Sequence, residues 1–197
     1  MRYTTREVTY IAMFVALSIL SVYIARIIPA IPILGVGVPL SFMPLISALS
    51  GMFLGVRGGV TAMVLYMMMG LIGLPVFAGG SGGPGSVFSP TFGFIIGYSG
   101  AALVAAIIFR RRPTPVVASL AALFALAPIY VIGIVYMDII MHVVLKTPAT
   151  LLGLTLSMTP FLIKDIVVNT LIGALASTLI RRLPSIDLEG QTFTPQD

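Results

Sequence analysis

Apolar segments about as long as a membrane is thick follow one another along almost the whole chain. Of its 197 residues, 58% are hydrophobic and 9% are charged, whereas about a quarter of the residues in a soluble domain are charged. A helix that crosses the hydrocarbon core of a bilayer needs about 20 apolar residues. We therefore expect an all-α polytopic membrane protein, folded as a single helical bundle.

Six segments qualify as membrane spans, of which the second and third are short. They are Val8–Ile28, Val38–Val56, Val60–Phe77, Thr91–Phe109, Val116–Met137 and Thr159–Ile180. The first is too long for the apolar region of a cleavable signal peptide, so we expect it to be retained. Leu151–Leu156 is expected to be a short interfacial piece. The bundle should occupy residues 1–183, and residues 184–197 should form a polar cytoplasmic tail.

The basic residues predict the orientation of this bundle. With six spans both termini lie on one side, and that side carries Arg2, Arg6, Arg57, Arg110, Arg111, Arg112, Arg181 and Arg182. The other side carries only Arg26 and Lys146, with Lys164 just inside a span. This bias predicts cytoplasmic termini and a multi-pass protein of the cell (plasma) membrane. The basic residues form no stripe, so the net charge of +5 does not indicate a nucleic-acid partner.

A glycine-rich loop, Leu74–Ser86, interrupts the apolar sequence on the outward side. Irregular backbone at membrane depth is tolerated only where it lines a cavity or packs inside protein, because its amides otherwise lack hydrogen-bond partners. We therefore interpret the loop as part of a binding site. The alternative is a flexible loop in solvent.

The same loop allows a catalytic hypothesis, which its context weakens. Residues 79–83 read Gly-Gly-Ser-Gly-Gly and match the Gly-x-Ser-Gly and Gly-x-Ser-x-Gly patterns of serine hydrolases. No strand is expected before Ser81, and the sole histidine, His142, follows the fifth span rather than lying in the sixth. An intramembrane serine hydrolase using Ser81 is therefore kept only as an alternative from a different class. The loop also lacks the Lys-Ser/Thr ending of a P-loop, so energy coupling must come from a partner.

Metal and cofactor chemistry is not expected. The absence of cysteine excludes disulfides, thiolate catalysis and Cys-ligated metal. Asp138 and His142, four residues apart, supply only two ligands, which do not make a metal site.

Lys164 and Asp165 are the only adjacent opposite charges within an expected span. Thr159 is expected to cap that span and Pro160 to be its first helical residue, so the pair would lie about 6–8 Å inside the helix. Asn169 follows Asp165 by one turn on the same face. Ionisable groups at such depth usually face a cavity or a partner. We interpret them as a polar clamp for a small ligand; a structural ion pair or a snorkelling lysine is the alternative.

Small residues at spacing four predict faces on which helices approach closely. Packing within the bundle is the default interpretation for these residues. Ala12 and Ala16 lie near the expected cytoplasmic end of the first span and could receive another protein. The other members of the set are Ser47, Gly51, Gly55, Gly93 and Gly97.

The run Gly73–Gly85 and the following Ser89–Tyr98 resemble the BioY family, the biotin-binding S components of energy-coupling factor (ECF) transporters. The resemblance covers nearly the whole chain and includes the late Pro160-Phe161-…-Asp165 element. Ala12-x-x-x-Ala16 is similar to the first-helix motif by which S components dock on a transmembrane coupling protein.

This resemblance implies capture of biotin from outside, followed by association with the coupling protein and two ABC-type ATPases. It implies that the glycine loop closes over the ligand and that Asp165 faces the ureido ring. Lys164 stands where the family usually has glycine, and Val168 stands where it has a lysine, so either Lys164 replaces that lysine or another cation, such as Arg26, contributes. The alternative ligand is another small vitamin. The candidate substrate-binding residues are Phe77, Gly79, Gly80, Ser81, Thr91, Phe94, Tyr98, Lys164, Asp165 and Asn169.

Overall fold

The structure is a computed structural model that describes residues 3–28, 31–33, 36–38, 41–111, 114–146 and 150–182. Its elements, in chain order, are α1 (Thr5–Ile27), β1 (Ile31–Ile33), β2 (Val36–Val38), α2 (Met43–Leu71), the 3-10 turns Ala78–Gly80 and Pro84–Phe88, α3 (Phe92–Arg111), α4 (Pro115–Phe124), α5 (Leu126–Val143) and α6 (Leu151–Arg182). The polar tail expected at residues 184–197 lies outside the described residues.

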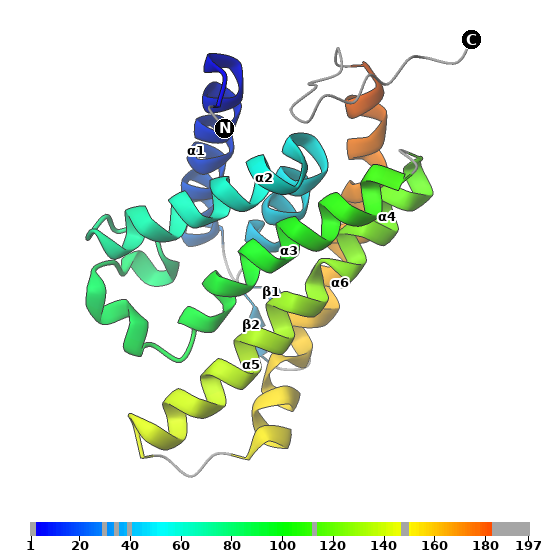
Figure 1. The fold of residues 1–197 in the computed structure, drawn as a ribbon. Helices are drawn as coiled ribbons and strands as arrows, with labels where there is room; N and C mark the ends of the chain where they lie inside the picture. Colours follow the sequence, from blue (N-terminus) through cyan, green and yellow to red (C-terminus); the bar gives the residue numbers. More distant parts are fainter. Residues whose placement is uncertain are drawn as a thin grey trace.

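The fold is a helical bundle with one short hairpin, in which β1 and β2 pair antiparallel (Figure 1). The second expected span therefore begins at Met43 rather than at Val38, because Val38 pairs with Ile31 in the hairpin. The described residues contain five helices long and apolar enough to cross a membrane, where the sequence predicts six spans. They are Thr5–Ile27, Met43–Leu71, Phe92–Arg110, Pro115–Val143 and Leu151–Gly173.

The difference in number lies in α2, which contains the second and third expected spans. Gly55 leaves the helical conformation there, with φ 70° and ψ −174°, a combination that essentially only glycine adopts. The two arms approach each other so closely that a Cβ atom on Gly59 would lie 2.7 Å from the Cα atom of Gly51. The chain thus reverses within what is otherwise a continuous run of helix.

The expected fifth span corresponds to α4 and α5 together, which are separated only at Ala125, a residue that keeps helical dihedral angles. Pro128 accounts for the interruption, because it has no N–H to donate to the carbonyl of Phe124. The second part of this span packs against α3 through glycine. A Cβ atom on Gly97 would lie 2.7 Å from the Cα atom of Ile129. The close approach expected for the small residues of α3 is therefore confirmed.

The start of the last helix differs from the prediction. α6 begins at Leu151, and Thr150 accepts a hydrogen bond from the amide of Gly153 at 3.1 Å. Pro160 lies inside the helix, so the expectation that Thr159 caps it is wrong, and the expected interfacial piece is its first turns. A proline inside a helix removes one backbone hydrogen bond, here to the carbonyl of Leu156, and the helix continues past it. The Lys164–Asp165 pair is consequently more than three turns from the start of α6.

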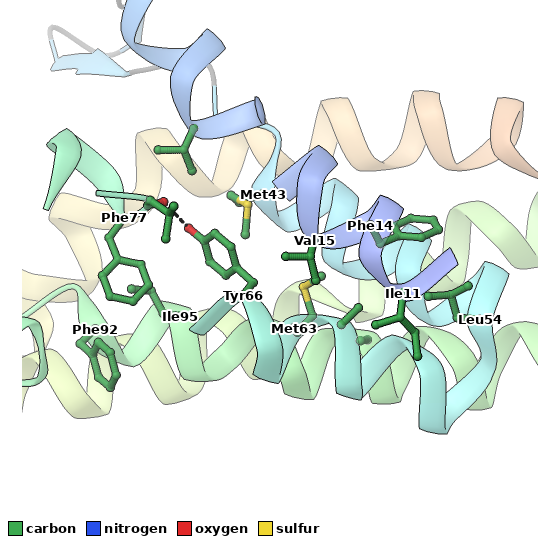
Figure 2. Packing of buried hydrophobic residues seen from close by; sticks show 14 residues of the cluster. Ile11, Phe14, Val15, Met43, Leu54, Met63, Tyr66, Phe77, Phe92 and Ile95 are labelled. Carbon is green, nitrogen blue, oxygen red and sulfur yellow. Dashed lines mark hydrogen bonds between the residues drawn. The ribbon is translucent and has the colours of Figure 1, made fainter. Parts of the chain in front are cut away.

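The main hydrophobic core joins α1, both arms of α2, the loop that follows and the start of α3. Figure 2 shows its side chains, with Ile11, Phe14 and Val15 of α1 directed toward α2. A second cluster, rich in alanine, joins α3 to α4 and α5. Toward the end of α1 and the start of α3, the first cluster adjoins a cavity that contains the polar residues described next.

Candidate functional site

A cavity of about 370 Å³ lies between the end of α1, the start of α2, the glycine loop, α3, α5 and α6. Its volume is within the range of small-molecule sites, about 300–1,000 Å³. Most of the exposed wall is apolar, and three charged side chains lie in it. The lining residues are Val22, Ala25, Arg26, Ser41, Met43, Pro44, Phe77, Ala78, Gly79, Ser81, Ser86, Ser89, Thr91, Phe92, Phe94, Ile95, Tyr98, Ile129, Tyr130, Met137, Met158, Phe161, Lys164 and Asp165.

One polar group in this wall is an ion pair buried between helices. The Lys164 ammonium lies 2.7 Å from Oδ1 of Asp165, and the two residues are 7% and 4% exposed. Lys164 also donates to the carbonyl of Ser41 at 2.9 Å, which ties α6 to the start of α2. Tyr130 of α5 donates its hydroxyl to Oδ2 of Asp165 at 2.7 Å. Three elements thus converge on this ion pair.

The Asp165 carboxylate retains capacity for a ligand. Its two oxygens accept about four hydrogen bonds in all, and two are taken by Lys164 and Tyr130. The ring of Phe94 meets that of Tyr130 edge to face, with centroids 5.9 Å apart, and presents an apolar surface beside the carboxylate. A ligand that donates N–H groups and carries an apolar ring matches this arrangement.

The glycine loop is anchored to the bundle through the buried residues Val76 and Phe77, while most of its other residues are exposed. The Phe77 ring packs on α2 at Gly70, where an added Cβ atom would lie 2.0 Å from the ring. Tyr66 donates its hydroxyl to the carbonyl of Val76 at 2.8 Å (Figure 2). The amide of Gly83 donates to the carbonyl of Gly70 at 2.7 Å. These contacts fix both halves of the loop to the end of α2 and favour its interpretation as part of the cavity wall.

Positive φ angles explain several of the loop glycines. Gly79, Gly80 and Gly83 have φ of 72°, 84° and 93°, where a side chain is strained. Their conformation carries the backbone past the cavity, so that Gly79 and Ser81 are both in its wall.

Arg26, at the end of α1, holds the other side of the loop. Its Nη2 donates to the carbonyls of Pro75 and Phe77 at 3.1 and 3.3 Å. The guanidinium lies 4.5 Å from the ring centroid of Tyr23, a cation–π contact. A Cβ atom on Gly80 would lie 3.1 Å from Nη1, so the positively charged group is close to the loop backbone. Arg26 is also in the cavity wall.

Comparison with known proteins identifies the family. A profile of the BioY family matches residues 1–185. The biotin transporter BioY of Rhodobacter capsulatus is 37% identical over 187 residues, which cover 91% of this chain and 96% of that protein. A probable biotin transporter BioY of Pyrococcus horikoshii is 33% identical over 162 residues, 82% of this chain and 88% of that protein. The chain belongs to the BioY family.

The fold agrees with this family membership. The crystal structure of an S component for biotin from an ECF-type ABC transporter superposes with a TM-score of 0.68. The match covers 94% of this chain and 96% of that one, at 22% sequence identity, and it shows that the two share a fold. The chain is therefore a multi-pass membrane protein with the architecture of an S component.

Most of the predicted site residues come together in the cavity. Eight of the ten line it, namely Phe77, Gly79, Ser81, Thr91, Phe94, Tyr98, Lys164 and Asp165. Gly80 is not in the wall and lies behind it, against Arg26. Asn169 is fully buried one turn beyond Asp165, whose carbonyl accepts a hydrogen bond from its amide at 2.9 Å. The substrate-binding role of all ten stays a prediction.

Sequence reasoning missed Tyr130 and Ser41, which complete the group around the ion pair. Tyr130 carries a polar hydroxyl within an apolar span. This is only a weak sequence signal for a site residue, because tyrosines are common in such helices. Ser41 contributes only its backbone carbonyl, which no residue type reveals.

The surroundings of Ser81 do not match a nucleophile. Its hydroxyl donates to the carbonyl of Ala78 at 3.1 Å. His142, the only histidine of the chain, pairs with Asp138 at 3.4 Å in the last turn of α5 and is not in the cavity wall. A nucleophilic serine needs a base within hydrogen-bond reach.

Ala12 and Ala16 are exposed on α1, whereas the preceding residues, Ile11 and Val15, are buried. Packing within the bundle therefore does not explain these two residues. Their neighbours on the exposed surface of α1 include Met13, Leu17 and Leu20.

Proposed function

We propose that this chain is the substrate-binding S component of an ECF-type transporter and that it captures biotin for uptake. The observation that carries the proposal is the cavity, with its apolar wall and its buried carboxylate. Many of its lining residues belong to the segments that carry the resemblance to the BioY family, and relatives over nearly the full length of the chain are named biotin transporters. This function is transport, not hydrolysis, and Ser81 is a loop residue.

Within this proposal, Asp165 accepts hydrogen bonds from the N–H groups of the ureido ring. Phe77, Phe94 and Tyr98 enclose the bicyclic ring system. Support comes from the two acceptor positions that Asp165 retains and from the aromatic wall around it. Gly79, Ser81 and Thr91 close the outer side. Asn169, through its bond to the Asp165 carbonyl, is proposed to keep that turn of α6 in place.

For the topology we propose six spans with cytoplasmic termini in the plasma membrane, formed by residues 1–183. The close approach of Gly51 and Gly59 supports counting the two arms of α2 as separate crossings. The Tyr3 hydroxyl contacts Thr61 at 2.7 Å, whereas Arg26 contacts the loop after α2. α1 and the second arm of α2 therefore run in the same direction, as six spans require.

We also propose that Ala12 and Ala16 receive the transmembrane coupling protein of an ECF module, which carries two ABC-type ATPases. Support comes from their exposure on α1. Because alanine side chains are small, the backbone of a partner helix can approach α1 closely at these two positions.

Calorimetric titration of the detergent-purified protein with biotin tests the function, with thiamine and riboflavin as competing vitamins. We expect selective binding of biotin. Replacing Asp165 by Ala should weaken it by about 1–3 kcal/mol, because the ligand N–H groups lose their acceptor. Folded protein that binds thiamine or riboflavin instead would support a different vitamin. Folded protein that binds none of the three would contradict the proposal.

A further inference from the structure

Arg26 is a cationic group in the cavity wall for which the described residues supply no carboxylate. The chain has six acidic residues, of which Asp187, Glu189 and Asp197 lie beyond the described residues. Asp165 is paired with Lys164 and Asp138 with His142. Glu7 accepts from the amide of Thr4 at the opposite end of α1, about 28 Å from Arg26 along the helix.

The guanidinium also has donors to spare. It carries five N–H groups in a planar fork. Both of its bonds within the described residues come from Nη2, to Pro75 and Phe77. Nη1 and Nε therefore have no acceptor among the described residues, and together they offer donors that fit a carboxylate.

Lys164 is the other cation in the wall, and its charge is already compensated. Its ammonium lies 2.7 Å from Asp165 and donates to the carbonyl of Ser41, so two of its three donors are used. Among the lining residues, Arg26 and Lys164 are positively charged and Asp165 is negatively charged, so the cavity wall has a net charge of one positive unit. A ligand with a single negative charge would balance it.

We propose that Arg26 binds the carboxylate of the ligand, beside the glycine loop that it contacts, and that Lys164 does not. The inference rests on the proposed function, and it sets the orientation of biotin. The ureido ring lies against the buried carboxylate of Asp165, and the acid tail lies beside the exposed side chain of Arg26 under the glycine loop. Arg26 thereby holds both the loop and the acid.

The test compares biotin with biotinamide, in which the carboxylate is replaced by a neutral amide. Calorimetric titrations use the full chain as wild type and as the variants Arg26→Gln, Arg26→Lys and Lys164→Met. Arg6→Gln is the matched control, because Arg6 lies on the same helix, is exposed and packs over the ring of Tyr10, away from the cavity. Wild-type protein should bind biotin about 10- to 150-fold more tightly than biotinamide, as expected for hydrogen bonds to a charged group.

Arg26→Gln should remove this preference, because biotin loses the carboxylate contact as well as the loop contacts, whereas biotinamide loses the loop contacts alone. Arg26→Lys should keep part of the preference, Lys164→Met should keep the preference, and Arg6→Gln should change neither affinity. Equal loss of both ligands in Arg26→Gln would reduce Arg26 to a loop anchor and overturn the inference. A preference that disappears in Lys164→Met instead would also overturn it.

The wild-type comparison is independent of whether any variant folds. If wild-type protein binds biotin and biotinamide equally, the inference fails and the proposed function stands. If it binds neither, both fail.

Discussion

The buried pair of Lys164 and Asp165 should show strong energetic coupling in a double-mutant cycle. The two charged atoms are 2.7 Å apart and the side chains are 7% and 6% exposed, so water does little to screen them. At an effective dielectric constant of about 20, their attraction is on the order of 6 kcal/mol before desolvation is subtracted. Removing one partner of such a pair typically costs about 3–5 kcal/mol, because the other charge stays buried and unpaired.

Asp165→Asn leaves the buried Lys164 ammonium with neutral acceptors and no counter-charge, and Lys164→Met leaves the Asp165 carboxylate with only the Tyr130 hydroxyl. Each variant should therefore lose about 3 kcal/mol or more in free energy of unfolding. In the double variant no charge is stranded, and the amide oxygen introduced by Asp165→Asn can still accept from Tyr130. Its stability should return to within about 2 kcal/mol of wild type, a coupling of at least about 4 kcal/mol.

Equilibrium unfolding in mixed micelles, followed by circular dichroism, measures the four free energies. The exposed pair of Asp138 and His142 is the matched control, since its atoms are 3.4 Å apart and its side chains are 31% and 50% exposed. The cycle Asp138→Asn with His142→Gln should give a coupling of no more than about 0.5 kcal/mol. If the losses at Lys164 and Asp165 add to within about 0.5 kcal/mol, the two charges do not stabilise each other and the reasoning is refuted.

Three further predictions concern the loop, the α3–α5 contact and the outer face of α1. Tyr66→Phe should lower the free energy of unfolding by about 1–2 kcal/mol and weaken biotin binding, because the Val76 carbonyl loses its hydrogen-bond partner. An unchanged affinity in calorimetry would show that the loop does not contribute to biotin binding. Gly97→Ala should lower the free energy of unfolding by about 1–3 kcal/mol, because its Cβ atom would lie 2.7 Å from the Cα atom of Ile129 in α5. Gly85→Ala, whose Cβ atom would have nothing within 4 Å, is the control and should change the stability little. Equal unfolding curves for the two variants would contradict this prediction. Ala16→Leu should leave biotin binding intact and impair uptake of labelled biotin by cells, and loss of binding would exclude a docking role.

The sequence predicts the parts of this molecule that depend on local composition. The lipid-spanning helices follow from apolar runs, and the functional interpretation of the Leu74–Ser86 loop follows from glycine at membrane depth. Lys164 and Asp165 stand out because two charges within an apolar span need each other or a cavity. Eight of the ten predicted site residues line the same cavity for these reasons.

The remaining features depend on distant parts of the chain or on alternatives that look alike in sequence. Tyr130 and Ser41 reach the ion pair from 35 and 123 positions away, and no spacing rule connects them to it. Pro160 fits the first turn of a helix as well as a helix interior with one lost hydrogen bond, and here the second applies. Gly55 belongs by spacing to a packing face with Ser47 and Gly51, although its role is to allow a positive φ.

The reversal at Gly55 has a practical consequence for mapping the orientation of the protein. Since a single residue makes the turn, the chain offers no connecting segment there in which a tag or a protease site could be inserted without separating Gly51 from Gly59. The chain contains no cysteine, so single cysteines can be introduced elsewhere and labelled from either side of the membrane without background. Thr5 and Gly85 are exposed, lie on opposite sides in the proposed topology and are suitable positions for such labels. A side chain at position 55, in contrast, would disturb the two arms of α2 whose orientation the label is meant to report.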